Sequence, residues 1–504
     1  MSSADETDAV VVGSGPNGLA AAVVLARAGL AVRVYEAQDT LGGGARTLDL
    51  GLGRGVRHDI CSAVHPMALA SPFFQAFDLP ARGVELIQPE IAYAQAFPGR
   101  AAAVAYRDLD RTSSELSSPG WKTLLRPLVA SQEAVTALAL GDQRSIPPGL
   151  VSKAGLRFGA QFAARLTRLR FDGAASLLGD DGAALLAGVA AHQIGPLRSC
   201  SAAAVGLTLS ALAHAVGWPI PRGGSQSLVD ALVADLLAHG ASVRTGCRIA
   251  AFESLPRARA YLFDCSPRAL ARLLGDRLPG SVRAGLLRYP YGNAATKVDF
   301  VLNEPVPWAD ERLRRAGTVH MGGSAAQVAS AERDVAAGRH APQPVVLVSQ
   351  PASFDPSRVG SSGQRPLWTY AHVPSGSDLD MTQTVIAQIE RAAPGFRDTI
   401  AASQCVPAAR LAEHNENYID GDIAVGAISL YRLFARPRPA WNPYRTGQQG
   451  VYLCSSATPP GPGVHGMAGL YAARAALRER FAVREMPELG PRPGPAEPGT
   501  KALF

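Results

Sequence analysis

Cysteines are few in this 504-residue sequence, and none of them lies at the spacing of a known motif. The six form no CxxC pair and no short metal-ligand pattern; they are Cys61, Cys200, Cys247, Cys265, Cys405 and Cys454. This usage favours neither a disulfide framework nor a zinc site. We therefore expect reduced thiols and no bound metal ion.

Runs of like charge are also absent. Lysine and arginine (49) outnumber aspartate and glutamate (42), but the basic residues are dispersed, which argues against nucleic acid as a partner. The first residues, MSSADETDAVVVG, lack the basic and apolar regions of a signal peptide, so we expect a cytoplasmic protein. One long uncharged stretch, 199–221, is rich in Ala, Gly and Ser and is predicted to be a buried helix rather than a membrane span.

No P-loop and no Ser/His/Asp nucleophile motif is evident, which leaves the glycine-rich N-terminus as the strongest signal. The pattern predicts a strand at 9–12, a GSGPNG turn, a helix at 19–28 and a second strand at 31–35. In such a unit Gly13 permits the tight turn, Gly15 lets the backbone approach a pyrophosphate, and Gly18 lets helix and strand pack. Glu36, at the end of the second strand, is expected to accept the ribose hydroxyl groups. These residues predict a dinucleotide site.

The next segment indicates which dinucleotide. Residues 41–46, LGGGAR, resemble the GG-x-R segment of the glutathione-reductase-type flavoproteins, in which backbone amides and the arginine meet the pyrophosphate. A guanidinium group suits phosphate geometry, so Arg46 is assigned to FAD.

Motifs along nearly the whole chain extend the resemblance. Together with GSGPNGLAAA, GGGART, PRGGSQSL and TVHMGGS, the segment VYLCSSATPPGPGVHGMAGLYAARAAL resembles the phytoene-desaturase-related FAD-dependent oxidoreductases, particularly the pyridine-nucleotide-disulphide-oxidoreductase-domain-2-like branch. The resemblance implies that the C-terminal strand, loop and helix close over the flavin, with a helix N-terminus near the ring that stabilises negative charge on it. Pro462 departs from the glycine that relatives often have there, which stiffens the loop.

The predicted fold is α/β, with a Rossmann-type FAD-binding domain and a discontinuous α+β substrate domain that carries a helical insert. The FAD domain is expected to comprise residues 1–75, 221–270 and 441–483, the substrate domain 76–220 and 271–440, and a disordered tail 484–504. The predicted FAD site comprises Gly13, Ser14, Gly15, Asn17, Gly18, Glu36, Ala37, Gly43, Gly44, Ala45, Arg46 and Ile249, and by resemblance Ser455, Ser456, Val464, His465, Gly466 and Met467.

Three residues are candidates for catalysis. Strand alternation in NAATKVDFVL places Lys297, Asp299 and Val301 on one face, and the segment resembles the strand that in amine-oxidase-type flavoproteins carries a lysine near flavin N5. The alternative is a salt bridge between Lys297 and Asp299 on a solvated face. His65 and His214 have an ordinary pKa near working pH and suit a base, although a structural role is the alternative.

A basic amphipathic helix is predicted at VSKAGLRFGAQFAARLTRLRF, residues 151–171. Phe158 and Phe162 share its apolar face, with arginines on the adjoining one. Such a helix either packs on the core with its arginines reaching to solvent, or rests on anionic lipid as a peripheral membrane contact.

The predicted reaction is hydride transfer from a C–H bond of an apolar or amphipathic substrate to flavin N5, forming a C=C or C=N bond and driven mainly by positioning. A second GxGxxG after a strand is absent, so the electron acceptor is expected to be O2, a quinone, another carrier or a transiently bound nucleotide. The alternatives are an amine oxidase, a flavin-dependent isomerase or saturase without net oxidation, and a binding protein with structural FAD.

Overall fold

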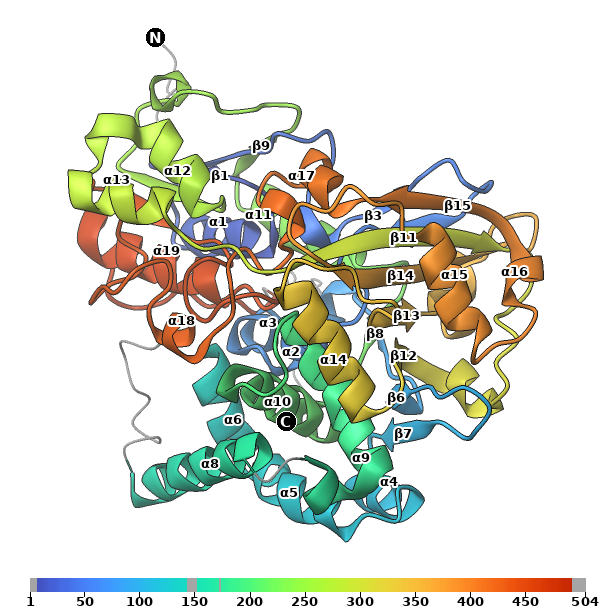
Figure 1. Ribbon diagram of the computed structural model, residues 1–504. Coiled ribbons are helices and arrows are strands. Elements are labelled where there is room, and N and C mark those ends of the chain that lie inside the picture. Colours follow the sequence, from blue (N-terminus) through green and yellow to red (C-terminus); the bar gives the residue numbers. More distant parts are fainter. Residues whose placement is uncertain (1–6, 143–151, 172–173, 492–504) are drawn as a thin grey trace, which may run out of the picture.

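The computed structural model describes residues 7–142, 152–171 and 174–491. It contains a parallel sheet, a larger mixed sheet beside it, and a layer of helices across one side of both (Figure 1). The mixed α/β architecture with a Rossmann-like domain confirms the predicted fold class.

The parallel sheet has five strands in the order β16-β10-β1-β2-β9. Every neighbouring pair is parallel. The strands are β1 (Ala9–Val12), β2 (Val32–Tyr35), β9 (Ser242–Arg244), β10 (Ala260–Phe263) and β16 (Val451–Leu453). All five come from the three segments predicted to form the FAD domain, so distant parts of the chain do build one sheet.

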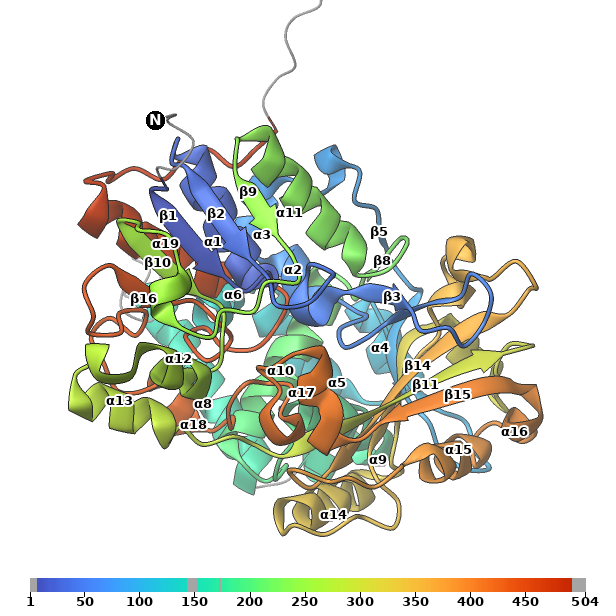
Figure 2. The ribbon, with the colours of Figure 1, turned by 90° about the horizontal axis from the view of Figure 1, so that it is seen from above.

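Helices cover both faces of this sheet, as a buried parallel sheet requires. One face packs α1 (Pro16–Arg27), α11 (Gln226–Ala238) and α19 (Met467–Arg480) in a single apolar core. The other packs α12 (Pro267–Leu274) and α13 (Gly280–Leu287). Figure 2 shows α1 and α19 side by side beneath β1 and β2. The predicted boundary at residue 270 falls inside α12, which packs on the nucleotide-binding sheet.

The mixed sheet has seven strands in the order β15-β11-β14-β13-β12-β6-β7, and only β12 and β6 pair in parallel. Its strands are β6 (Ile91–Gln95), β7 (Ala103–Tyr106), β11 (Ala294–Leu302), β12 (Ala316–Met321), β13 (Val346–Ser349), β14 (Arg365–Val373) and β15 (Ile400–Val406). The outer face is apolar and packs α15 (Thr382–Glu390) and α16 (Phe396–Thr399). The inner face receives α9 (Ala174–Ala190) and α14 (Ala325–Ala336).

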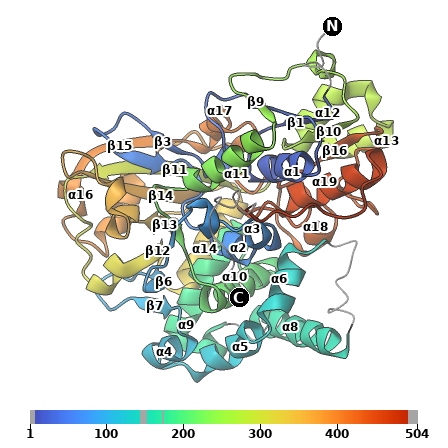
Figure 3. The ribbon, with the colours of Figure 1, turned by 180° about the vertical axis from the view of Figure 1, so that it is seen from behind.

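The helical insert forms the layer at the bottom of Figure 3. Its helices are α4 (Leu109–Glu115), α5 (Pro119–Val129), α6 (Gln132–Leu140), α8 (Lys153–Phe171), α9 and α10 (Cys200–Ala215). In the described ranges one stretch, Ala174–Gln193, is long and apolar enough to cross a membrane, and 61% of its apolar window is buried within the fold. The predicted helix in 199–221 is α10, which packs against α9 as a core helix does.

Short elements connect these layers. They are the hairpin β3 (Thr47–Asp49) and β4 (Arg57–Asp59), the helices α2 (Pro66–Ala70), α3 (Pro72–Phe77), α17 (Leu411–His414) and α18 (Leu430–Phe434), and the paired strands β5 (Leu86–Ile87) and β8 (Ile220–Pro221).

The C-terminal tail, predicted to be disordered over 484–504, is ordered as far as residue 491. The Arg27 guanidinium donates to the carbonyl oxygens of Glu488 and Gly490, which fixes this part to α1. The rest of the predicted tail, 492–504, lies outside the described residues.

Candidate dinucleotide-binding site

The turn between β1 and α1 is shaped by glycine. Gly13 has a φ of 97°, a conformation that favours glycine. A Cβ atom at Gly18 would lie closer than 3.0 Å to the carbonyl oxygen of Gly13, so helix and strand could not pack with a larger residue there. The steric roles predicted for Gly13 and Gly18 are therefore confirmed.

Glu36 fastens this turn to the end of β2. Its Oε2 accepts hydrogen bonds from the Ser14 amide (2.9 Å) and the Ser14 hydroxyl (2.6 Å), while its Oε1 accepts from the Gln38 amide (2.9 Å). A carboxylate offers about four acceptor positions, so the buried Glu36 keeps capacity for a ribose hydroxyl.

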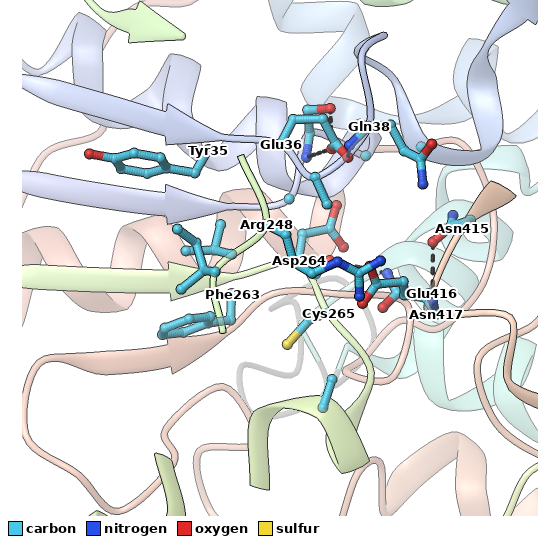
Figure 4. Close-up of a pocket in the computed structure, with 18 of the residues that line it drawn as sticks. Tyr35, Glu36, Gln38, Arg248, Phe263, Asp264, Cys265, Asn415, Glu416 and Asn417 are labelled. Carbon is cyan, nitrogen blue, oxygen red and sulfur yellow. Dashed lines mark hydrogen bonds and ion pairs between the residues drawn. The ribbon is translucent and has the colours of Figure 1, made fainter. Parts of the chain in front are cut away.

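A cavity of about 140 Å³ opens beside Glu36 (Figure 4). Five segments that are distant in sequence surround it, and all lie at or near the carboxyl ends of the parallel strands, where such sheets bind ligands. Their residues are Val12–Gly15, Tyr35–Gln38 with Gly43, Cys247–Ile249, Phe263–Cys265 with Ala269 and Leu273, and His414–Asn417. The structure thus brings together seven of the predicted site residues, namely Gly13, Ser14, Gly15, Glu36, Ala37, Gly43 and Ile249.

Arg46 lies behind the glycine loop rather than in the cavity wall. Its buried guanidinium donates to the Gly43 carbonyl oxygen (2.9 Å), the Thr40 hydroxyl (3.0 Å) and the His414 carbonyl oxygen. Burial lowers the pKa of Arg46, although Glu36 raises it. Gly44 and Ala45 belong to the same short helical turn, and a Cβ at Gly44 would collide with the Tyr418 hydroxyl. The backbone of Gly43 therefore faces the cavity, and the fixed positive charge of Arg46 lies behind it.

The C-terminal loop reaches the other side of the same turn. Helix α19 packs closely against α1. A Cβ atom added to Gly469 of α19 would lie closer than 3.0 Å to the backbone of Asn17, the second residue of α1. Val464 and Met467 belong to the core around α1, Gly466 begins α19, and Ser455 caps the loop by accepting from the Ala457 amide. Ser456 follows in the same loop. The terminal segment and the first βαβ turn are thus neighbours, but residues 455–467 do not line the cavity.

His465 holds this loop in place. Its Nε2 donates to the Gly461 carbonyl oxygen (3.1 Å) and its Nδ1 accepts from the Met467 amide (3.0 Å). Burial lowers the pKa of His465 to about 4, although the Gly461 bond raises it, so the ring is neutral at working pH. Both ring nitrogens of His465 are therefore used to hold the backbone of its own loop.

Lys297 forms an ion pair with Asp299 on β11, and both side chains are about 5% exposed. The salt bridge proposed as an alternative is therefore present, but its face is buried and not solvated. Across the strand pair, Lys297 faces Tyr370 and Asp299 faces Trp368 on β14, and the Trp368 ring centroid lies 5.3 Å from Lys297 Nζ. His414, at the edge of the cavity, is close enough that both charges affect its pKa, which burial lowers.

Cys61 lies between the mixed sheet and the glycine loop, and its carbonyl oxygen accepts a hydrogen bond from the Trp368 ring (3.0 Å). Its sulfur lies 3.3 Å from the Tyr418 hydroxyl, and it follows β4, directly before Ser62, whose amide donates to the Gly44 carbonyl oxygen (3.0 Å). Burial raises the pKa of the thiol, while Tyr418, Lys297 and Arg46 lower it. The inner face of the mixed sheet and the nucleotide loop therefore meet at Cys61 and Tyr418.

The contacts of the two other catalytic candidates fit the structural role that was the alternative for both. His65 Nε2 donates to the Ser225 hydroxyl (2.7 Å), and His214 accepts from the Trp121 ring (3.1 Å) while its Nδ1 donates to the Arg107 carbonyl oxygen (3.1 Å). Burial lowers the pKa of each histidine to about 4. Neither lines the cavity. These contacts give both rings a structural role and do not support their use as bases.

The hairpin after the glycine loop is tied to the core by Asp59. Asp59 accepts from the Thr47 hydroxyl (2.6 Å), the Ser225 amide (2.9 Å) and the Arg358 guanidinium (3.0 Å). Burial raises the pKa of Asp59, but Arg358 and these hydrogen bonds lower it further, so it lies below its usual value.

Sequence reasoning missed Asp264 and the segment 414–417. Asp264 directly follows β10, and the rule that ligands bind at the carboxyl ends of parallel strands could have singled it out. Residues 414–417 carry no motif, and only the tertiary fold brings them to the cavity.

Comparisons with known proteins agree with this geometry. Residues 11–77 match the family model described as an NAD(P)-binding Rossmann-like domain. The chain is 24% identical to the pyridine nucleotide-disulfide oxidoreductase domain-containing protein 2 of Rattus norvegicus, with 94% of each chain covered. Among solved structures, a putrescine oxidase variant is 16% identical with a TM-score of 0.58, covering 94% of this chain and 99% of its own. The cyclohexylamine oxidase of Brevibacterium oxydans is 14% identical with a TM-score of 0.53, covering 95% and 98%. The chain thus has a Rossmann-like dinucleotide-binding domain, resembles an oxidoreductase-domain protein over most of its length, and shares its fold with amine oxidases.

Proposed function

We propose that the protein is an FAD-dependent oxidoreductase that removes a hydride from a C–H bond of an apolar or amphipathic organic substrate. The observation that carries the proposal is that Trp368, whose ring lies 5.3 Å from Lys297 Nζ on the inner face of the substrate sheet, donates to the Cys61 carbonyl oxygen (3.0 Å) beside the dinucleotide loop. The domain of the parallel sheet holds the nucleotide site, and the inner face of the mixed sheet beside it is buried and partly polar.

The residues present fit the adenosine and phosphate end of a dinucleotide. Glu36 keeps acceptor capacity for a ribose hydroxyl, and the N-terminus of α1 attracts phosphate. When bound, FAD supplies two-electron redox chemistry at its ring. Arg46 would provide positive charge behind the phosphates.

The protein's own contribution is to orient the substrate and to exclude water. The inner face around Lys297 is buried and is lined by the rings of Trp368 and Tyr370, whose centroids lie 5.1 Å apart. Such a wall suits an apolar donor held in one orientation, and a water-excluding site strengthens every electrostatic interaction within it. The electron acceptor is proposed to be O2, a quinone or another carrier.

A second candidate, amine oxidation, is favoured by the same pair of rings. Trp368 and Tyr370 meet edge to face beside the Lys297–Asp299 pair, and adjacent aromatic faces bind amines well. Solved structures with the same fold include a putrescine oxidase and a cyclohexylamine oxidase. These likenesses support the candidate without deciding the substrate.

The test is anaerobic purification followed by a visible spectrum, extraction of the cofactor and addition of amines, polyenes and apolar alcohols. We expect a yellow protein whose flavin bleaches with one of these classes, and bleaching by amines alone would select amine oxidation. Glu36→Gln should lose flavin, whereas the exposed Glu304→Gln should retain it. A colourless protein that binds no FAD on reconstitution would refute the proposal, and a flavin that no substrate reduces would favour an isomerase or a binding protein.

A further inference from the structure

The carboxylate of Asp264 lies on the N-terminus of α1. Asp264 follows β10 directly, and its Oδ2 accepts a hydrogen bond from the Gly18 amide at 2.9 Å. A Cβ atom on Gly15 would lie closer than 3.0 Å to the same oxygen. The chain's own anion therefore rests on the glycine turn.

That turn is also where a dinucleotide places its pyrophosphate in folds of this kind, because free amides and the helix dipole attract negative charge there. One amide hydrogen cannot serve two anions, and two negative groups at contact distance repel each other. A bound pyrophosphate and an ionised Asp264 therefore exclude each other at Gly18, unless the carboxyl group moves away or takes up a proton.

The surroundings leave the Asp264 charge poorly compensated. Among the described residues its only side-chain hydrogen bond is the one from Gly18. The arginines of the glycine loop and of the cavity wall are engaged elsewhere: Arg46 with backbone oxygens and Thr40, and Arg248 with Glu416 at 2.6 Å in a largely exposed pair. The titratable and charged groups that share the cavity with Asp264 or lie close enough to affect it are Tyr35, Glu36, Cys247, Arg248, Cys265, His414, Glu416 and Cys454.

Proton affinity agrees with this geometry. Burial raises the pKa of Asp264 to about 7 against the lowering effect of the Gly18 hydrogen bond, with a smaller upward contribution from Glu36. The carboxyl group is therefore about half protonated near neutral pH. A neighbouring phosphate raises the pKa again, because it disfavours the charged form.

We infer that Asp264 competes with the dinucleotide's pyrophosphate for the N-terminus of α1, so that the dinucleotide binds with uptake of a proton and binds more weakly as the pH rises. This rests on the proposed function only in placing a dinucleotide at this turn. The sign follows from linkage: affinity is greatest where Asp264 is already protonated, and it falls by up to tenfold per pH unit above that range.

Calorimetric titration of the apoprotein tests the inference. FAD and NAD⁺ are suitable probes because their pyrophosphate diesters do not titrate near neutrality. Titrations from about pH 6 to about pH 8, in two buffers with different ionisation enthalpies, report the number of protons taken up. For the unaltered protein we expect an uptake that approaches one proton near the upper end, and affinity that falls by about tenfold across the range.

Asp264→Asn keeps the shape of the side chain and removes its charge. We expect it to bind FAD about tenfold more tightly than the unaltered protein at about pH 8, equally at about pH 6, and without proton uptake. Glu416→Gln is the matched control, because it removes another acid from the cavity wall that does not contact α1; its proton uptake should equal that of the unaltered protein.

The outcomes separate the two claims. FAD binding without proton uptake in the unaltered protein, or an unchanged pH dependence in Asp264→Asn, would overturn the inference and leave the proposed function standing. Binding of neither dinucleotide at any pH would overturn the proposed function and this inference with it. The uptake measured on the unaltered protein decides the question even where the variant fails to fold.

Discussion

Replacing Gly469 by alanine should separate the first and last helices of the nucleotide-binding domain. The new Cβ would lie closer than 3.0 Å to three backbone atoms of α1, namely the carbonyl carbon and oxygen of Asn17 and the Ala21 nitrogen. Backbone atoms cannot rotate away as a side chain can, so the two helices must move apart. Overpacking of a core costs typically 1–3 kcal/mol, and we expect about 3 kcal/mol here.

Urea unfolding followed by circular dichroism measures this cost. Gly285→Ala is the matched control, because Gly285 lies inside α13 and has no neighbouring atom within 4 Å of its Cβ position. That substitution should stabilise the protein by about 0.5–1 kcal/mol, since alanine loses less backbone entropy than glycine in a helix. Dinucleotide affinity should fall in Gly469→Ala alone, because Asn17 belongs to the phosphate-binding turn. A Gly469→Ala protein as stable as the unaltered one would refute the close contact between α1 and α19.

Three further expectations concern other parts of the molecule. Lys297→Met removes the ammonium group from the buried Asp299, whose Oδ1 also lies 3.4 Å from His58 Nδ1, and should lower the free energy of unfolding by about 3 kcal/mol, measured by urea unfolding; a loss below about 1 kcal/mol would show that the His58 ring compensates the charge of Asp299. The pKa of Asp59 is lowered by folding, so its contribution to stability is present above about pH 4 and is lost as the pH falls through its folded pKa. The stability difference between the unaltered protein and Asp59→Asn should therefore shrink below about pH 4, and a difference constant with pH would contradict this. For α8 we propose peripheral contact with anionic lipid: the unaltered protein should sediment with phosphatidylserine vesicles and Lys153→Glu/Arg157→Glu should not, and an unaltered protein that stays in the supernatant would exclude the contact.

The sequence predicted best what is encoded locally. The turn from Gly13 to Gly18 and the acid Glu36 lie within one βαβ unit, so spacing alone determines their arrangement. The apolar face of helix α8 could also be predicted from its sequence. Phe158 and Phe162 are buried in the helical core, which fits packing of the helix on the core, while lipid contact stays a prediction. Likewise, the alternation along β11 correctly separated Lys297 from the apolar outer face.

Properties that depend on distant partners could not be predicted in the same way. The pKa values of His65 and His214 are set by burial, and their ring partners Ser225 and Trp121 lie more than ninety residues away. A histidine in a sequence therefore does not reveal whether its ring is free to act. The strand end could have singled out Asp264 as a ligand candidate, but its contact with the glycine turn could not be predicted, because Gly18 lies far away in the sequence.

The strand order of the parallel sheet also determines when the protein can mature. β1 lies in the middle of that sheet, and its neighbour β10 and the edge strand β16 are made much later, the last of them near the end of the chain. During synthesis the first βαβ unit therefore leaves the ribosome with one side of its central strand unpaired, a state prone to wrong pairing. The nucleotide pocket is completed only once residues 414–417 have been made, and a chain that stops before β16 would carry the glycine turn on a sheet that lacks one edge strand.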